Sequence, residues 1–167
     1  MTVVDIQFLI THKQSRAGVI PFTIYNDEMY FLLACDRRSR DLCDFGGGCK
    51  MGESLLTTAI REFQEESNGI FEQHYSPQVF GESVPVIGKN MTIIFLPIDP
   101  SWIDRAAGDF SKKFNDEIST VRWVSLRTFK EIVYNPGNTR LWIRLRSFLM
   151  DNIDIERLCL ILACAFI

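Results

Sequence analysis

The sequence has little histidine and no paired cysteines. Its two histidines, His12 and His74, are isolated and lack the spacing of zinc ligands. Its five cysteines are odd in number and form no C-x-x-C pair, a pattern typical of free thiols in a reducing compartment. We therefore expect a cytoplasmic protein that is organised neither by a zinc site nor by a disulfide framework.

The chain also lacks a strong charge of either sign and a long apolar run. Its net charge of −3 gives no general attraction to nucleic acid or anionic lipid, so any phosphate-binding site must be local or must use a metal ion. The first residues include Asp5 and do not form a basic segment followed by a long apolar run, so we expect no signal peptide. The apolar stretch at 158–167 is shorter than the roughly 20 residues that a membrane-spanning helix needs.

What the sequence does contain is the composition of one ordinary globular domain, with 47% hydrophobic and 23% charged residues. Two runs rich in β-branched and aromatic residues, 17–25 and 28–36, flank Asn26-Asp27 and predict a β-hairpin. Pro21 in the first run favours an edge position or a bulge. Further elements are expected as strands at about 78–86, 91–98 and 119–125 and as helices at 54–67, 125–133 and 139 to about 151. This succession predicts an α+β sandwich with a C-terminal helical region at about 139–167.

Three glycines at 46–48 lead into the predicted helix at 54–67, whose charges are unfavourably placed. Glu62, Glu65 and Glu66 lie near its C-terminal end, where the helix dipole disfavours anions, and they repel one another. At about 100° per residue, Glu66 points into the apolar stripe of this helix and Glu62 lies along the edge of that stripe. A buried carboxylate without a partner costs several kcal/mol, far more than repulsion on a surface.

A divalent cation would resolve this conflict. Hard ions such as Mg²⁺ bind carboxylate and carbonyl oxygens, and the glutamates together with the adjacent glycine loop provide both. Glu53, at the start of the helix, can form an ion pair with Arg61, and groups that orient metal ligands in this way are common around metal sites. The residues themselves therefore predict a metal site at this helix.

The same residues resemble a known family motif. Gly47, Glu53 and the run from Arg61 to Glu66 stand at the offsets of the Nudix box, G-x5-E-x7-R-E-U-x-E-E-x-G-U, in which U is an aliphatic or aromatic residue. The resemblance implies a single Nudix domain over residues 1–167 with its box at about 47–69. It also implies the α+β Nudix fold, in which a mixed β-sheet is sandwiched between helices in an α/β/α arrangement.

By this resemblance the chain is a metal-dependent hydrolase that uses Mg²⁺ or Mn²⁺ to cleave a diphosphate linkage in a nucleoside diphosphate derivative. The implied metal ligands are the carbonyl of Gly47 and the carboxylates of Glu62, Glu65 and Glu66. Glu62 could instead act as the general base. The resemblance gives the remaining catalytic roles to Glu53 and Arg61, which tie the motif together, and to Glu117 in a later loop, with Asp116 as the alternative to Glu117.

The sequence departs from the motif at two positions. These departures affect the expected geometry of the loops that flank the helix more than the set of metal ligands. Family members often have proline before the paired glycines, whereas this chain has Phe45 followed by three glycines. The glycine that follows the paired glutamates is replaced by Asn68, and Gly69 comes one residue later. Asparagine tolerates the left-handed backbone region nearly as well as glycine, so neither departure removes a ligand.

The sequence leaves the substrate open. Arg37, Arg38 and Arg40 could bind phosphates, and an aromatic side chain could stack on a base. The aromatic candidates are Tyr25, Tyr30, Phe31 and Trp102. Candidate substrates are a dinucleotide polyphosphate, a nucleotide sugar, a nucleoside triphosphate, a diphosphoinositol polyphosphate and the 5′ cap of RNA. The cap would need a basic track, for which Arg140, Arg144 and Arg146 beside Trp142 are a hint.

The alternative from another class of function is a catalytically inactive nucleotide-binding module. The intact glutamates of the box argue against this alternative.

The apolar C-terminal stretch at 158–167 must be covered. Burying about ten apolar residues contributes on the order of 10 kcal/mol, and leaving them exposed would create an unusually large apolar patch. The segment lacks the polar positions of a one-sided surface helix. We therefore expect one of its faces to pack on its own domain and another on a partner chain, which predicts a homodimer.

Overall fold

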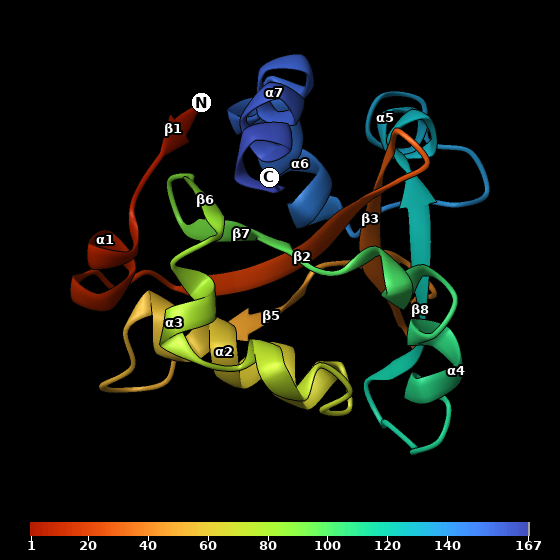
Figure 1. Cartoon of the computed structure of the whole chain (residues 1–167). Helices are drawn as coiled ribbons and strands as arrows, with labels where there is room; N and C mark the ends of the chain where they lie inside the picture. The colour runs from red at the N-terminus through yellow and green to blue at the C-terminus, as the bar shows by residue number, and fades with distance from the viewer. Residues whose placement is uncertain (167) are drawn as a thin grey trace.

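The structure, a computed structural model, describes residues 1–166 and consists of a mixed β-sheet between two layers of helices (Figure 1). The strands are β1 (Thr2–Val3), β2 (Arg16–Tyr25), β3 (Glu28–Asp36), β4 (Leu42–Cys43), β5 (Phe45–Gly48), β6 (Val84–Ile87), β7 (Met91–Pro97) and β8 (Ile118–Ser125). The helices are α1 (Ile6–Thr11), α2 (Leu55–Glu66), α3 (Pro77–Phe80), α4 (Ala106–Phe110), α5 (Leu126–Tyr134), α6 (Ile143–Asn152) and α7 (Ile155–Phe166), with 3₁₀ turns η1 (Glu72–His74) and η2 (Pro100–Ile103).

The sheet is built around the long strand β2. Its strands lie in the order β1-β6-β7-β2-β3-β4, with β5 paired to β2 and β8 paired to β3. The β2–β7 pair is parallel, whereas the other pairs are antiparallel. The predicted hairpin is confirmed: Asn26 and Asp27 join β2 to β3 with φ values of 51° and 62°, as a two-residue type I′ turn requires.

The expectation for Pro21 was wrong, because β2 is an interior strand. On one side of β2, pairing with β5 ends at Val19, and pairing with β3 begins at Phe22. Pro21 lies at this change of partner, where the missing N–H of a proline interrupts neither pairing. An interior strand can therefore contain a proline at this position, and β2 needs no bulge to accommodate it.

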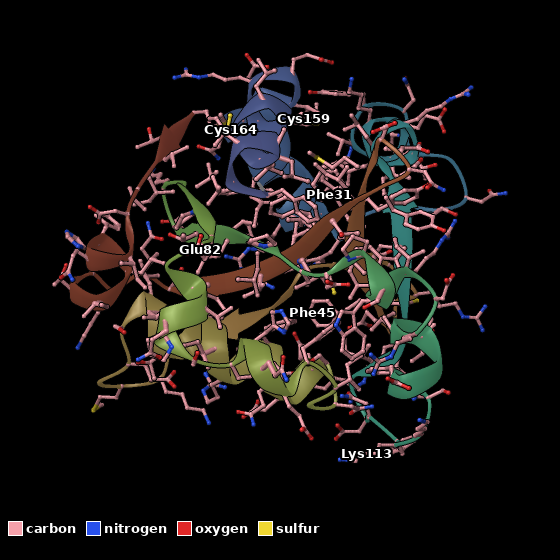
Figure 2. All side chains as sticks on the ribbon, in the orientation of Figure 1. Phe31, Phe45, Glu82, Lys113, Cys159 and Cys164 are labelled. Carbon is pink, nitrogen blue, oxygen red and sulfur yellow. The ribbon has the colours of Figure 1, made fainter. Side chains whose placement is uncertain are left out.

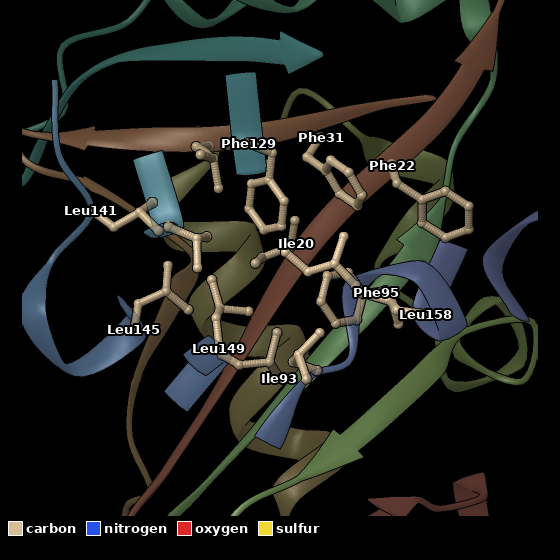
Figure 3. Packing of buried hydrophobic residues seen from close by; sticks show 14 of the residues in the cluster. Ile20, Phe22, Phe31, Ile93, Phe95, Phe129, Leu141, Leu145, Leu149 and Leu158 are labelled. Carbon is tan, nitrogen blue, oxygen red and sulfur yellow. The ribbon is translucent and has the colours of Figure 1, made fainter. Parts of the chain in front are cut away.

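Each face of the sheet carries its own hydrophobic core, which confirms the predicted α/β/α arrangement. One core packs under α5, α6 and α7 and includes Ile20, Phe31 and Phe95 (Figure 3). The other packs against α2 and includes Phe45 and Phe63, whose ring centroids lie 5.5 Å apart. Figure 2 shows Phe31 and Phe45 on opposite sides of β2.

Helix α2 forms where the sequence predicts it. The hydroxyl of Ser54 caps its N-terminus by accepting a hydrogen bond from the N–H of Thr57 at 3.2 Å. Asn68 and Gly69 end it with φ values of 57° and 67°. The apolar stripe packs on the sheet, so that the polar edge of α2 and the glycines of β5 face each other.

Two predicted elements differ in the structure. The strand expected at 78–86 is a short helix, α3, followed by the shorter strand β6, because Pro77 occupies the first helical turn, where its fixed φ favours helix. The helix expected from residue 139 begins only at Ile143. Leu141 bridges to Leu42 beside the sheet, and this contact keeps 140–142 extended. The short elements α1, α4, β1, β4 and β5 were not predicted.

The C-terminal stretch forms α7 and covers one face of the sheet. Ile155, Leu158 and Leu162 are buried in the core, whereas Leu160 is exposed. Among the helices of residues 1–166, none combines the length and apolar character that crossing a membrane requires. Ile167, the last residue of the predicted apolar stretch, lies outside the described residues. The homodimer stays a prediction.

Candidate active site

Arg61 on α2 is the centre of the charged cluster. Its Nε donates to Oε2 of Glu53 at 2.7 Å and its Nη2 to Oε1 of the same carboxylate at 2.9 Å. Its Nη1 donates to Glu62 at 2.8 Å and to Glu65 at 3.4 Å. These hydrogen bonds raise the pKa of Arg61, with Glu53 as the main cause, and hold the pKa of Glu53 at about 2. The predicted ion pair between Glu53 and Arg61 is present.

The three glycines of β5 let the backbone approach this cluster closely. The N–H of Gly46 donates to Oε1 of Glu66 at 2.7 Å, and the carbonyl of Gly48 accepts from Arg61 at 3.2 Å. A Cβ added at Gly47 would lie 2.5 Å from Cδ of Glu62. The glycine run is therefore the place where the loop and the carboxylates of α2 meet.

Glu66 is buried at this meeting point, with 8% of its surface exposed. Burial raises the pKa of Glu66 to about 9, against the opposing effect of the Gly46 N–H, and repulsion from Asp44, Glu62 and Glu117 adds to the rise. Glu66 thus points inward as the helical spacing predicts. Glu62 is largely covered and Glu65 is exposed, with side-chain exposures of 13% and 57%.

Behind the glycines lies a buried ion pair that sequence reasoning missed. Arg16 donates to both carboxylate oxygens of Asp44, at 2.7 and 3.1 Å, and Asp44 is fully buried. Burial disfavours the charged form of Arg16, but the attraction of Asp44 outweighs burial, so the pKa of Arg16 is raised. A Cβ at Gly18 would lie 2.8 Å from Cγ of Asp44, so this glycine leaves room for the pair. No sequence signal connects Arg16 on β2 with Asp44, which lies 28 positions later between β4 and β5.

A cavity of about 200 Å³ opens beside Glu66. The guanidinium of Arg16 stacks over the ring of Trp142, 4.7 Å from its centroid, and both line this cavity. Its lining consists of Arg16, Asp36, Ser39, Cys43, Gly46, Glu66 and Trp142. The buried carboxylate therefore faces a space bounded by a cation and an aromatic ring.

Glu117 lies in the loop that leads into β8. Its carboxylate is close enough to contribute to the raised pKa of Glu66, although the two residues are 51 positions apart in the sequence (117 − 66). Its backbone N–H donates to Asn115 at 3.0 Å, and its carbonyl accepts from the N–H of Arg37 at 2.8 Å. Asp116, the alternative candidate, is exposed in the same loop.

The predicted phosphate-binding arginines lie on the exposed turn between β3 and β4. The Nε of Arg37 donates to the carbonyl of Asn115 at 3.0 Å, so this side chain braces the Glu117 loop. The N–H of Arg38 donates to Asp36, and Arg40 has a positive φ of 64°. Ser39 in this turn and Asp36 at the end of β3 line the cavity beside Glu66, whereas the three arginines do not.

The aromatic candidates are mostly placed elsewhere. Phe31 is fully buried in the core, so the expectation that it could stack a base was wrong. Trp102 packs on Phe71 with ring centroids 4.6 Å apart and lines a different cavity. Tyr25 is exposed, and Tyr30 donates to Glu28 near the hairpin turn. The ring that lines the cavity beside Glu66 belongs to Trp142.

The arginines around Trp142 do not form one continuous track. Arg140 pairs with Asp41 at 2.9 Å, and Arg144 lies over the Trp142 ring at 5.3 Å. The Nε of Arg146 instead donates to the carbonyl of Val133 at 2.7 Å, so this side chain is turned toward α5. The spacing of the three arginines in the sequence therefore does not translate into one shared surface.

The residues present fit a divalent cation by charge and donor type. Within residues 1–166 no three His, Cys, Asp or Glu side chains converge into a ready cage. Arg61 holds the carboxylates of Glu62 and Glu65, whereas Glu66 turns to Gly46. Burial of Glu66 near other carboxylates is unfavourable without a compensating positive charge. Carboxylate and carbonyl oxygens are the ligands that Mg²⁺ and Mn²⁺ prefer.

Comparison with known proteins agrees with the motif and the fold. Residues 14–144 match the NUDIX domain family, which covers more than half of the chain. No curated protein sequence matches the chain. An Ap4A hydrolase from C. elegans, solved as a binary complex, aligns with a TM-score of 0.54 and 18% identity over 90% of this chain and 98% of that protein.

Two further solved structures align with the chain. A MutT/nudix family protein from Listeria innocua aligns with a TM-score of 0.50 and 17% identity over 72% of this chain and 83% of that protein. One from Enterococcus faecalis aligns with a TM-score of 0.47 and 13% identity over 68% of this chain but 44% of that protein, so the chain spans less than half of that relative. The structural likeness concerns the fold, and the family match carries the assignment: the chain belongs to the Nudix family of pyrophosphohydrolases.

Proposed function

We propose that the chain hydrolyses the diphosphate linkage of a nucleoside diphosphate derivative with the help of Mg²⁺ or Mn²⁺. One observation carries the proposal: Glu66 is a buried carboxylate beside other acids, it lies on the helix of the Nudix box, and it faces a cavity. A fold that needed only stability would not keep an ionisable carboxyl group in such a place. A function that uses a cation accounts for it.

Each charged residue of the box has a role in this proposal. The carbonyl of Gly47 and the carboxylates of Glu62, Glu65 and Glu66 would hold the cation. When bound, the cation would neutralise the diphosphate and lower the pKa of a water molecule. Arg61 orients the carboxylate of Glu62 through its 2.8 Å hydrogen bond and is itself fixed by Glu53.

The general base is Glu62 or Glu117 in this proposal. Glu62 is held by Arg61 and lies against Gly47, which gives it a defined orientation. Glu117 comes from a different segment, the loop before β8, which Arg37 braces. Either carboxylate can accept a proton from the attacking water, which then displaces phosphate in line and leaves a phosphate monoester on each side.

The cavity sets bounds on the substrate. Its volume of about 200 Å³ is below the roughly 300–1,000 Å³ of sites that enclose a whole drug-sized ligand, so it accommodates one part of the substrate. Trp142 and Ser39 line it, which suits a base or a sugar, while the diphosphate would lie toward Glu66. Arg37, Arg38 and Arg40 are exposed on the adjacent turn and could bind further phosphates.

Several substrate classes satisfy these bounds. The likeness to an Ap4A hydrolase supports a dinucleoside polyphosphate as one candidate through the fold alone. A nucleotide sugar, a nucleoside triphosphate and a diphosphoinositol polyphosphate are the others. The 5′ cap of RNA is disfavoured by the inward orientation of Arg146.

A panel of these compounds, assayed for phosphate or nucleotide release with and without Mg²⁺, tests the proposal. We expect hydrolysis of at least one nucleotide substrate only when the metal is present. Binding of nucleotides without hydrolysis under any metal condition would instead support the inactive binding module.

A further inference from the structure

Asn68 occupies the position at which the Nudix box has a glycine, and it does more than end the helix. Its φ of 57° lies in the left-handed region that the box glycine supplies without steric cost. Asparagine tolerates this region, so the backbone alone does not require the substitution. The reason for the side chain lies in the contacts that glycine could not make.

The side-chain amide of Asn68 bridges two segments through three hydrogen bonds. Its Nδ2 donates to the carbonyl of Phe110 at 3.0 Å and to the carbonyl of Lys113 at 3.1 Å. Its Oδ1 accepts from Nδ2 of Asn115 at 3.0 Å. These contacts reach across from the end of α2 to the last residue of α4 and to the segment that follows it, more than 40 positions along the chain.

Asn115 completes the connection from the other side. Its Nδ2 also donates to the carbonyl of Glu65 at 3.1 Å, one residue before Glu66. Its Oδ1 accepts from the backbone N–H groups of Glu117 at 3.0 Å and of Ile118 at 2.9 Å. The two amides therefore connect the backbone of the metal-site helix directly to the backbone that carries Glu117.

This connection matters because the segment has no regular secondary structure of its own. Residues 111–117 form no helix or strand, and Phe114 within it is 78% exposed. Arg37 also braces this segment, since its N–H donates to the carbonyl of Glu117 and its Nε donates to the carbonyl of Asn115. The position of the Glu117 carboxylate relative to Glu66 thus depends in part on side-chain hydrogen bonds made by Asn68, Asn115 and Arg37.

We propose that Asn68 and Asn115 form an amide clamp that positions Glu117 against the metal-site helix. The proposal rests on the function proposed above, in which Glu117 takes part in catalysis. Asn68 and Asn115 are positioning residues, since they act through Glu117 rather than on substrate. In this chain the asparagine that replaces the box glycine therefore contributes to catalysis by positioning Glu117.

The test uses Asn68→Gly, which restores the glycine of the box, keeps the left-handed backbone available and removes only the side chain. Asn26→Gly is the matched control, because Asn26 also has a positive φ, 51°, and lies in the hairpin turn between β2 and β3. On the best substrate of the panel, we expect Asn68→Gly to lower kcat at least about tenfold, as small displacements of catalytic groups do, with little change in KM. Asn26→Gly should keep full activity.

A double-mutant cycle with Glu117→Gln separates positioning from a general loss of structure. If Asn68 acts through Glu117, Asn68→Gly should cost less than about twofold once Glu117 is already replaced. An equal loss in both backgrounds would overturn the proposal, as would full activity of Asn68→Gly or of Glu117→Gln alone.

Hydrogen exchange provides a readout that does not depend on activity. The amides of Glu117 and Ile118 should exchange faster in Asn68→Gly than in the wild type, because their acceptor on Asn115 loses its support. Unchanged exchange at both amides would overturn the clamp even if activity fell. If the wild type hydrolysed nothing in the panel, the proposed function would fail, and this exchange measurement would still decide whether the clamp exists.

Discussion

Gly47 and Glu62 lie so close together that no side chain fits between them. A Cβ at position 47 would be 2.5 Å from the carboxylate carbon Cδ of Glu62, nearer than real Cβ atoms approach. Glu62 is held in this place by Arg61, whose Nη1 donates to it at 2.8 Å. The close approach of the Glu62 carboxylate to strand β5 therefore requires glycine at position 47.

Gly47→Ala should displace the carboxylate of Glu62 and lower kcat/KM by about a hundredfold, the order expected for a misplacement of about 1 Å. Steady-state kinetics on the best substrate check this. Gly108→Ala is the control, because a Cβ added at Gly108 meets nothing within 4 Å. Equal activity of the two variants would show that the close approach has no catalytic meaning.

Arg61→Lys keeps a positive charge but loses the planar fork that binds both oxygens of Glu53 and reaches Glu62. We expect kcat/KM to fall about 10- to 100-fold, as it does when groups that orient metal ligands are changed. Arg127→Lys serves as control, since Arg127 is 87% exposed and its nearest carboxylate oxygen, on Glu131, lies 3.5 Å away. A wild-type value of kcat/KM for Arg61→Lys would show that the hydrogen bonds of the Arg61 guanidinium are not needed for catalysis.

Glu117→Gln should lower kcat more than KM, because a base or a late metal ligand contributes mainly in the transition state. Asp116→Asn, one residue away in the same exposed loop, should leave both constants nearly unchanged. Small and equal effects from the two substitutions would remove this loop from the mechanism.

The buried Glu66 makes the metal-free protein sensitive to pH. Its pKa is raised from 4.5 to about 9 in the folded state, so its carboxyl stays protonated there while the unfolded chain is already ionised. Its contribution to stability is therefore complete below pH 4.5 and is lost as the pH rises toward about 9. In EDTA, the Tm of the wild type should fall over this range more than that of Glu66→Gln. Parallel Tm curves for the two proteins would contradict the burial argument.

The sequence was sufficient to predict the site helix because several local signals agree there. Ser54 caps it, an apolar stripe runs along it, and Asn68-Gly69 ends it. The inward direction of Glu66 follows from the same helical geometry. The hairpin at Asn26-Asp27 was predictable for a similar reason, since its turn chemistry is local.

Contacts between distant segments could not be predicted in this way. The pair of Arg16 and Asp44 depends on β2 lying beside β5, which is a property of the sheet and not of either segment. The amide clamp depends likewise on the segment before β8 lying against the end of α2. Asn68 was visible as a departure from the box, but its partners were not.

The errors have the same origin. Pro21 was expected at an edge or a bulge because a proline has no N–H to donate to a neighbouring strand, yet the change of partner along β2 accommodates it. Phe31 was a candidate to stack a base, whereas the packing of α5 on β3 buries it against Phe129, with ring centroids 4.4 Å apart. Tertiary packing determines where such residues lie, and this packing cannot be inferred from the local pattern of a single sequence.

The most direct test of the metal-site assignment is the Mg²⁺ dependence of hydrolysis by the wild type and by Glu66→Gln, measured on the best substrate of the panel. We expect the activity of the wild type to rise with Mg²⁺ and to disappear in EDTA. We also expect Glu66→Gln, folded and at saturating Mg²⁺, to have a kcat at least about a hundredfold lower. A near wild-type rate for Glu66→Gln, or equal hydrolysis with and without the metal, would contradict it.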